Sequence, residues 1–214
     1  MDNPLVSTLT AATLHDEKLI AFPDRLQNIF ADMDRKYGIA AEYYGFQCQG
    51  CQENCCRTRF YHHTYLEYLS IRRGFGNLDP LRQSAIRLKA EEVCRPTDLS
   101  DNKGLPVRRM CPLNQDGLCA LYEQRPMICR LHGIPHELQK PGQPPIHGPG
   151  CGAFDERCPD KSYFKFDRTQ FYFEMARLEN EFKQTAGLTG RLKLTIAEMV
   201  MRIGHGVEDI GHRA

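Results

Sequence analysis

The sequence predicts a mostly α-helical protein with little or no β-sheet, in which a helical scaffold carries a long irregular region that binds metal through cysteines. Apolar residues recur at helical spacing in five segments, and the 214 residues include ten cysteines. Nine of these cysteines fall where no helical or strand pattern is found. We expect residues 1–214 to form a single domain, because this length suits one domain better than two.

Each expected helix begins at a polar capping signal followed by one apolar stripe. Four of the signals are a capping residue with a partner three positions later, as in Thr64 with Glu67 and Thr195 with Glu198, and the fifth is Asp79 before Pro80. Asp24 is expected to cap the first helix, and Gly38 to end it in a left-handed conformation. The helices are expected at residues 24–37, 64–73, 79–95, 167–187 and 195–203.

Two segments between these helices, residues 45–59 and 96–165, are expected to be metal-binding loops. The second is rich in proline and glycine, and residues 106–110 are the candidate for one side of a small β-ribbon. A structureless loop of this length is unusual inside a compact domain, so something other than a conventional core must hold it. A metal centre would do so, because the free energy of ligand binding contributes to folding.

Composition excludes several classes of partner. The 28 basic and 27 acidic side chains are nearly balanced, so nucleic acid and an anionic membrane surface are not expected. No apolar run reaches about eighteen residues, the length of a transmembrane helix. The first residues carry no pattern of a secretory signal, so we expect a cytoplasmic protein. Its partner is expected to be a protein or a small molecule that the sequence does not identify, and the oligomeric state is left open.

The cysteines form two groups. In a reducing cytoplasm, clustered cysteines act as metal ligands or redox groups more often than as disulfides. Cys94 stands apart at the end of an expected helix, and we expect it to be a small buried apolar residue. The remaining nine are the candidate metal ligands: Cys48, Cys51, Cys55 and Cys56 in the first loop, and Cys111, Cys119, Cys129, Cys151 and Cys158 in the second.

An iron–sulfur cluster, specifically 4Fe-4S, is favoured over zinc. A cluster needs four thiolates, and the steps Cys111–Pro112 and Cys158–Pro159 are similar to the cysteine–proline step of bacterial ferredoxins. Neighbouring arginines would offset the negative charge of a cluster: Arg57, Arg125, Arg130 and Arg157. Zinc stays open as the alternative, since nine thiolates also suffice for two tetrahedral zinc sites.

Outside the cysteines, the sequence identifies no catalytic residue, and whether the protein is an enzyme is left open. His62 and His63 are expected to be exposed loop residues, whereas His132 follows Cys129 at ligand spacing and is a weaker candidate ligand. Tyr122 and Arg125 are candidates for groups that support the ligands.

The cysteine segments resemble the YkgJ-type cysteine-cluster proteins, which are named for a CxxCxxCC motif. The resemblance is carried by residues 48–57, which contain Cys48-Gln49-Gly50-Cys51 and Cys55-Cys56-Arg57, and by three short segments between Cys111 and Arg130. It implies a zinc- or iron-chelating domain. Flagellin lysine N-methylases are similar to the same family and are thought to carry an iron–sulfur cluster, so a group-transfer enzyme is a further alternative.

The first segment departs from the family motif. Three residues, Gln52-Glu53-Asn54, separate Cys51 from Cys55, where the motif has two. This leaves open which of Cys55 and Cys56 takes the family's ligand position.

Overall fold

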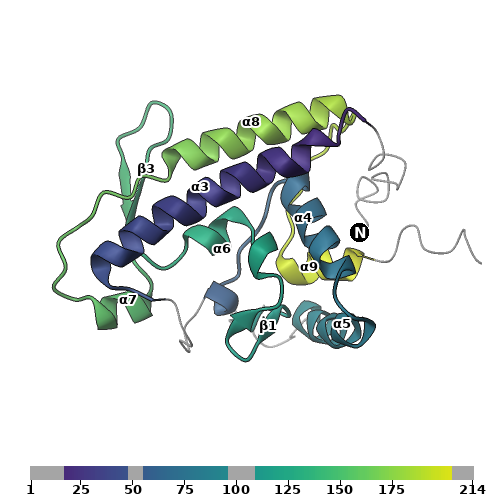
Figure 1. The fold of residues 1–214 in the computed structure, drawn as a ribbon, viewed down its shortest axis with the longest axis horizontal. Helices are drawn as coiled ribbons and strands as arrows, with labels where there is room; N and C mark the ends of the chain where they lie inside the picture. Colours follow the sequence, from purple (N-terminus) through teal and green to yellow (C-terminus); the bar gives the residue numbers. More distant parts are fainter. Residues whose placement is uncertain (1–16, 48–54, 96–108, 204–214) are drawn as a thin grey trace, which may run out of the picture.

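The structure, a computed structural model, describes residues 17–47, 55–95 and 109–203 and is mostly helical (Figure 1). A helix is present in each of the five expected places, although the bounds differ by several residues. These helices are α3 (Ala21–Tyr44), α4 (Tyr65–Gly76), α5 (Pro80–Cys94), α8 (Thr169–Thr185) and α9 (Ile196–Arg202).

The first of these helices is longer than expected. Helix α3 runs through Gly38 and ends only before Gly45, which has a positive φ of 65° and whose N–H bonds to the carbonyls of Ala41 and Glu42. The predicted stop at Gly38 is therefore wrong. A glycine inside a helix costs about 1 kcal/mol relative to alanine, and burial of Ala40 and Tyr44 in the next turn outweighs that cost.

Several predicted helix ends are confirmed. Asp79 caps α5 by accepting the N–H of Arg82, with Pro80 at the first helical position. Thr195 and Glu198 form a complete capping box on α9. Asp24, in contrast, lies inside α3, whose N-cap is Ile20, so that predicted cap is wrong.

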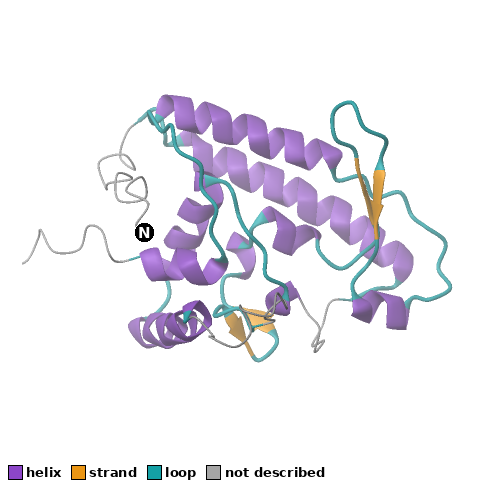
Figure 2. Cartoon of the chain, turned by 180° about the vertical axis from the view of Figure 1, so that it is seen from behind, coloured by secondary structure: helices purple, strands orange, loops and turns teal. Residues whose placement is uncertain are grey.

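Helices α3 and α8 form an antiparallel pair that builds much of the core. Phe22 near the start of α3 packs edge-on against Phe182 near the end of α8, with ring centroids 5.4 Å apart. At the opposite end Lys36 donates to Gln170 across 3.1 Å. Figures 1 and 2 both show the two helices side by side, with α4, α6 (Met127–Leu131) and α9 on one side of the pair.

The region between α5 and α8 contains little regular structure in its described part, as expected. Two antiparallel ribbons occur, and Figure 2 shows them well apart. In order along the chain, the elements between α5 and α8 are β1 (Asn114–Gln115), β2 (Leu118–Cys119), the 3₁₀ turn η3 (Tyr122–Gln124), α6, β3 (His136–Leu138), β4 (Ile146–Gly148) and α7 (Gly152–Arg157).

Two expectations about this region are wrong for the described residues. Arg109 and Met110 form no strand, and the first ribbon begins only after Cys111; residues 106–108 of the candidate strand lie outside the described part. The expectation that no conventional core holds the region is also wrong. Its side chains Leu113, Leu131 and Ile134 are at most 2% exposed and belong to the same apolar core as the helices.

In the described part of the chain, no helix combines the length and the apolar character needed to cross a membrane.

Candidate metal centre

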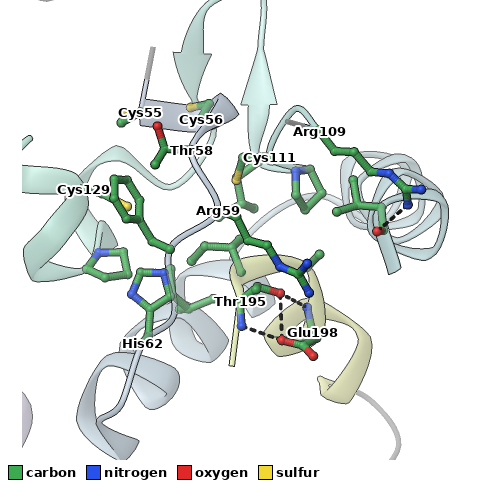
Figure 3. A pocket seen from close by; sticks show the side chains of 18 of the residues that line it. Cys55, Cys56, Thr58, Arg59, His62, Arg109, Cys111, Cys129, Thr195 and Glu198 are labelled. Carbon is green, nitrogen blue, oxygen red and sulfur yellow. Dashed lines mark hydrogen bonds between the residues drawn. The ribbon is translucent and has the colours of Figure 1, made fainter. Parts of the chain in front are cut away.

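A cavity of about 270 Å³ brings five of the nine candidate ligands together: Cys55, Cys56, Cys111, Cys119 and Cys129. They come from three segments that are distant in sequence: the 3₁₀ turn η1 (Cys55–Arg57), the β1–β2 ribbon with the residues before it, and α6. Figure 3 shows Cys55, Cys56, Cys111 and Cys129 around the same space.

A backbone hydrogen bond joins the first two segments. The N–H of Cys111 donates to the carbonyl of Cys56 across 2.7 Å. This bond places the two cysteine side chains next to each other whatever occupies the cavity.

The β1–β2 ribbon folds Cys119 back toward Cys111. Asn114 lies opposite Cys119 in the antiparallel register, and its N–H donates to the carbonyl of Cys111 across 2.9 Å. Asp116 and Gly117 make the tight turn with positive φ angles of 50° and 87°, the pair of values that a two-residue hairpin requires. The seven residues between Cys111 and Cys119 are therefore Pro112, Leu113 and the hairpin as far as Leu118.

Helix α6, which carries Cys129, is anchored to two of the long helices. The N–H of Met127 donates to the buried carboxylate of Glu67 in α4 across 2.8 Å. The buried guanidinium of Arg130 bonds to Asp34 of α3 and lies over the Phe30 ring, 4.1 Å from its centroid. These contacts hold Cys129 at the wall of the cavity.

The thiols in the cavity influence one another's ionisation. Hydrogen bonds from the Cys111 and Cys55 thiols stabilise the Cys56 thiolate and lower the pKa of Cys56 well below its usual value. The same interaction with Cys56, together with burial, raises the pKa of Cys111. Burial also raises the pKa of Cys119 and Cys129. Ionisation of the Cys56 thiol is thus favoured in this cavity, whereas ionisation of the Cys111, Cys119 and Cys129 thiols is opposed; a bound cation would favour their thiolates.

The cavity is not an assembled ligand set. Within residues 17–47, 55–95 and 109–203, no three histidine, cysteine, aspartate or glutamate side chains converge on a point where one ion would sit. Cys48 and Cys51 lie outside these residues. What fits a metal is the chemistry of the donors, since soft thiolates gathered in one cavity select zinc or iron–sulfur clusters.

Two candidate ligands do not line this cavity. Cys151 is the N-cap of α7, and its N–H donates to the carbonyl of Gly133 across 3.0 Å. Cys158 is 7% exposed, packs in the apolar core, and places its sulfur 3.5 Å from the carbonyl oxygen of Tyr44. Cys158, expected to be a metal ligand in a loop, therefore lies among apolar side chains and away from this cavity.

Cys94 was expected to be buried and to take no part in the site, and neither expectation holds. It is exposed at the end of α5 rather than buried, and it lines the cavity that holds the five candidate ligands. The end of α5 is brought there by Arg109, which donates to the carbonyls of Glu92, Val93 and Arg95.

Positive charge surrounds the cavity, but only one of the four predicted arginines lines it. Arg125 does so, and its guanidinium lies 3.6 Å from the centroid of the Tyr122 ring. Arg59, Arg95 and Arg109 also line the cavity, although the sequence analysis did not single them out. Because both clusters and thiolates are negative, these side chains favour an anionic occupant.

His62 lies in a different environment from the one expected. It was expected to be exposed together with His63, but His62 is 3% exposed and lines the cavity, whereas His63 is exposed. Burial alternates along Tyr61, His62 and His63, as is typical of an extended segment, but the sequence of these three residues has no apolar–polar alternation that would have indicated it. His132, the candidate by spacing, packs edge-on against Phe60 with centroids 5.4 Å apart and does not line the cavity.

Comparison with known proteins adds no relative. A scan against protein-family models, a search of curated proteins and a search of solved structures each gave no match to this chain. The resemblance to the YkgJ-type cysteine-cluster proteins therefore stays a prediction that rests on the quoted cysteine segments.

Proposed function

We propose that this chain is a cytoplasmic metal-binding protein whose cysteines hold an iron–sulfur cluster of the 4Fe-4S type, used in redox chemistry or within an enzyme. The observation that carries the proposal is the gathering of five cysteines, from three distant segments, around one cavity. Unrelated small buried residues would have no reason to meet in this way.

The donor set supports this assignment. A 4Fe-4S cluster takes four cysteine thiolates, and the cavity offers five. Arg59, Arg109 and Arg125 in the same lining would offset the cluster's negative charge, which is one of the properties that set its reduction potential. When bound, such a cluster supplies one-electron transfer.

The residues around the thiols would act on the ligands. The side chain of Asn114 is among the groups that lower the pKa of Cys56, so it favours the thiolate that a metal needs. Glu67 and Arg130 hold the helix that presents Cys129.

Zinc is the second candidate, and a specific observation favours it. The thiols connect η1, the β1–β2 ribbon and α6, so a tetrahedral zinc ion there would fasten the irregular region to the scaffold. In that case the protein would be a zinc-stabilised structural or interaction module. The number of thiols alone does not separate the two metals.

Purification without oxygen separates them. Iron and inorganic sulfide in equal amounts, with visible absorption that bleaches on reduction, are expected for the cluster. Colourless protein with stoichiometric zinc would overturn the cluster in favour of zinc, and protein without bound metal would overturn both.

A matched pair of variants locates the site. We expect Cys129→Ser to reduce the metal content strongly, because Cys129 lines the cavity, and Cys151→Ser to retain it, because Cys151 does not. Both thiols are half-buried, so the two substitutions are comparable in exposure. Equal loss of metal from both variants would contradict the location.

A further inference from the structure

The His62 side chain has a ring nitrogen that lacks a hydrogen-bonding partner among the described residues. Its Nε2 is inaccessible to water and makes no hydrogen bond within the described part of the chain. The residue is 3% exposed, and its side chain lines the cavity that the five cysteines share. In Figure 3 its ring lies on the same side of the cavity as Cys129.

The backbone of His62 is held in place on both sides. Its N–H donates to the carbonyl of Leu194 across 2.8 Å, and its own carbonyl accepts from the N–H of Leu194 across 3.0 Å. Two residues later Thr64 caps α4 by accepting the N–H of Glu67. The pairing with Leu194 and the start of α4 at Thr64 thus fix the backbone that carries the His62 ring.

An imidazole in this position is suited to one role in particular. Buried polar groups in folded proteins almost always have a partner, so a buried nitrogen without one, on a side chain that lines the cavity, points to a group that the described residues do not supply. Burial lowers the pKa of His62 to about 4, so the ring is neutral near pH 7. A neutral imidazole offers a lone pair, which is what zinc and iron accept from histidine.

We propose that His62 is a ligand of the metal that the cavity cysteines bind, so that the centre has a mixed cysteine and histidine donor set. This inference rests on the proposed function, because it needs a metal at the thiols. For zinc it corresponds to a set of cysteines with one histidine, and for a cluster to a histidine in place of one cysteine.

The variants are chosen so that a purely structural role gives a different result. His62→Leu removes both ring nitrogens and keeps an apolar side chain, and His62→Cys keeps a side chain that can bind metal. His63→Leu is the matched control, since His63 is the exposed neighbour. The full chain is stripped of metal and titrated with zinc against a chelator, and its unfolding is measured without metal.

Without metal, His62→Leu is expected to be as stable as the wild type. It is expected to bind zinc about 10- to 100-fold more weakly, because even the loss of a group that supports a ligand lowers metal affinity by this factor. His62→Cys is expected to recover most of the affinity, and His63→Leu to equal the wild type. X-ray absorption of the zinc-loaded wild type should show one nitrogen ligand at about 2.0–2.1 Å beside sulfur ligands at about 2.3 Å. That nitrogen should be absent from His62→Leu.

Two results would overturn the inference and leave the proposed function intact: a ligand shell of sulfur alone in the wild type, or unchanged zinc affinity in His62→Leu. A nitrogen ligand that persists in His62→Leu would also overturn it, and would assign that ligand to another histidine such as His132. A wild type that binds neither zinc nor iron at its cysteines would instead refute the proposed function.

Discussion

Replacing Glu67 by methionine is expected to destabilise the protein through the segment that presents Cys129. Glu67 is 4% exposed, and its carboxylate accepts the N–H of Met127 across 2.8 Å and the hydroxyl of Thr64 across 2.7 Å. Methionine fills a similar volume but accepts neither bond. The change therefore leaves a buried N–H at the start of α6 without a partner.

The magnitude follows from these contacts. A buried donor left unpaired costs about 1–3 kcal/mol, so two such donors set an upper limit of about 6 kcal/mol. The Thr64 hydroxyl can rotate to another acceptor, which removes much of the second contribution. Burial also raises the pKa of Glu67, so methionine relieves part of the penalty of burying a charge. We expect a net loss of about 2 kcal/mol in the free energy of unfolding.

Urea unfolding of the metal-free protein at pH 7 measures this loss, provided that the slopes of the variants agree. Glu67→Gln retains an acceptor oxygen, so it should lose less than Glu67→Met. Glu92→Met makes the same change on the exposed face of α5 and should stay within about 0.5 kcal/mol of the wild type. If Glu67→Met were as stable as Glu92→Met, Glu67 would not be the anchor of α6.

Two further predictions concern the scaffold. Glu179 of α8 accepts the N–H groups of Tyr65 and Leu66 at the start of α4, and burial raises the pKa of Glu179 to about 7 from a reference of 4.5. Because the folded pKa is raised, the contribution of Glu179 is complete below about pH 4.5 and is lost as pH rises to about 7, by about 3 kcal/mol at most. Unfolding at several pH values should show this slope in the wild type and a smaller one in Glu179→Gln, where the buried Glu67, whose pKa is also raised, remains. Leu131→Ala, at a side chain with no exposure, should lower the free energy of unfolding by about 2–5 kcal/mol in urea, and a loss below about 1 kcal/mol would show that this part of the irregular region is not core.

Helix starts were predicted correctly where the capping residue and the group that it bonds are only a few residues apart in the sequence. Asp79 with Pro80, and Thr195 with Glu198, make their hydrogen bonds within one turn, so the sequence contains both partners of each bond. The end of α3 was predicted wrongly for the opposite reason. Gly38 is a local stop signal, but Ala40 and Tyr44 are buried by residues that lie far away in the sequence.

In the candidate site too, local sequence predicted some features, and contacts between distant residues decided the others. Cysteine spacing predicted a thiol-rich centre in the irregular region, and five of the nine candidates do share a cavity. Spacing had no means of separating these from Cys151 and Cys158, because all nine lie outside the helices that the sequence predicts. The burial of His62 was also hidden, since the residue that pairs with its backbone, Leu194, lies far away in the sequence.

The sequence by itself determined the helical class of the protein, most helix starts and the abundance of thiols, because these depend on composition and on contacts within a turn. The tertiary structure decided which thiols are neighbours and which histidine joins them. That choice depends on bonds between distant segments, from Cys111 to Cys56, from Met127 to Glu67 and from His62 to Leu194. Such bonds join residues that are far apart in the sequence, so no local pattern specifies them.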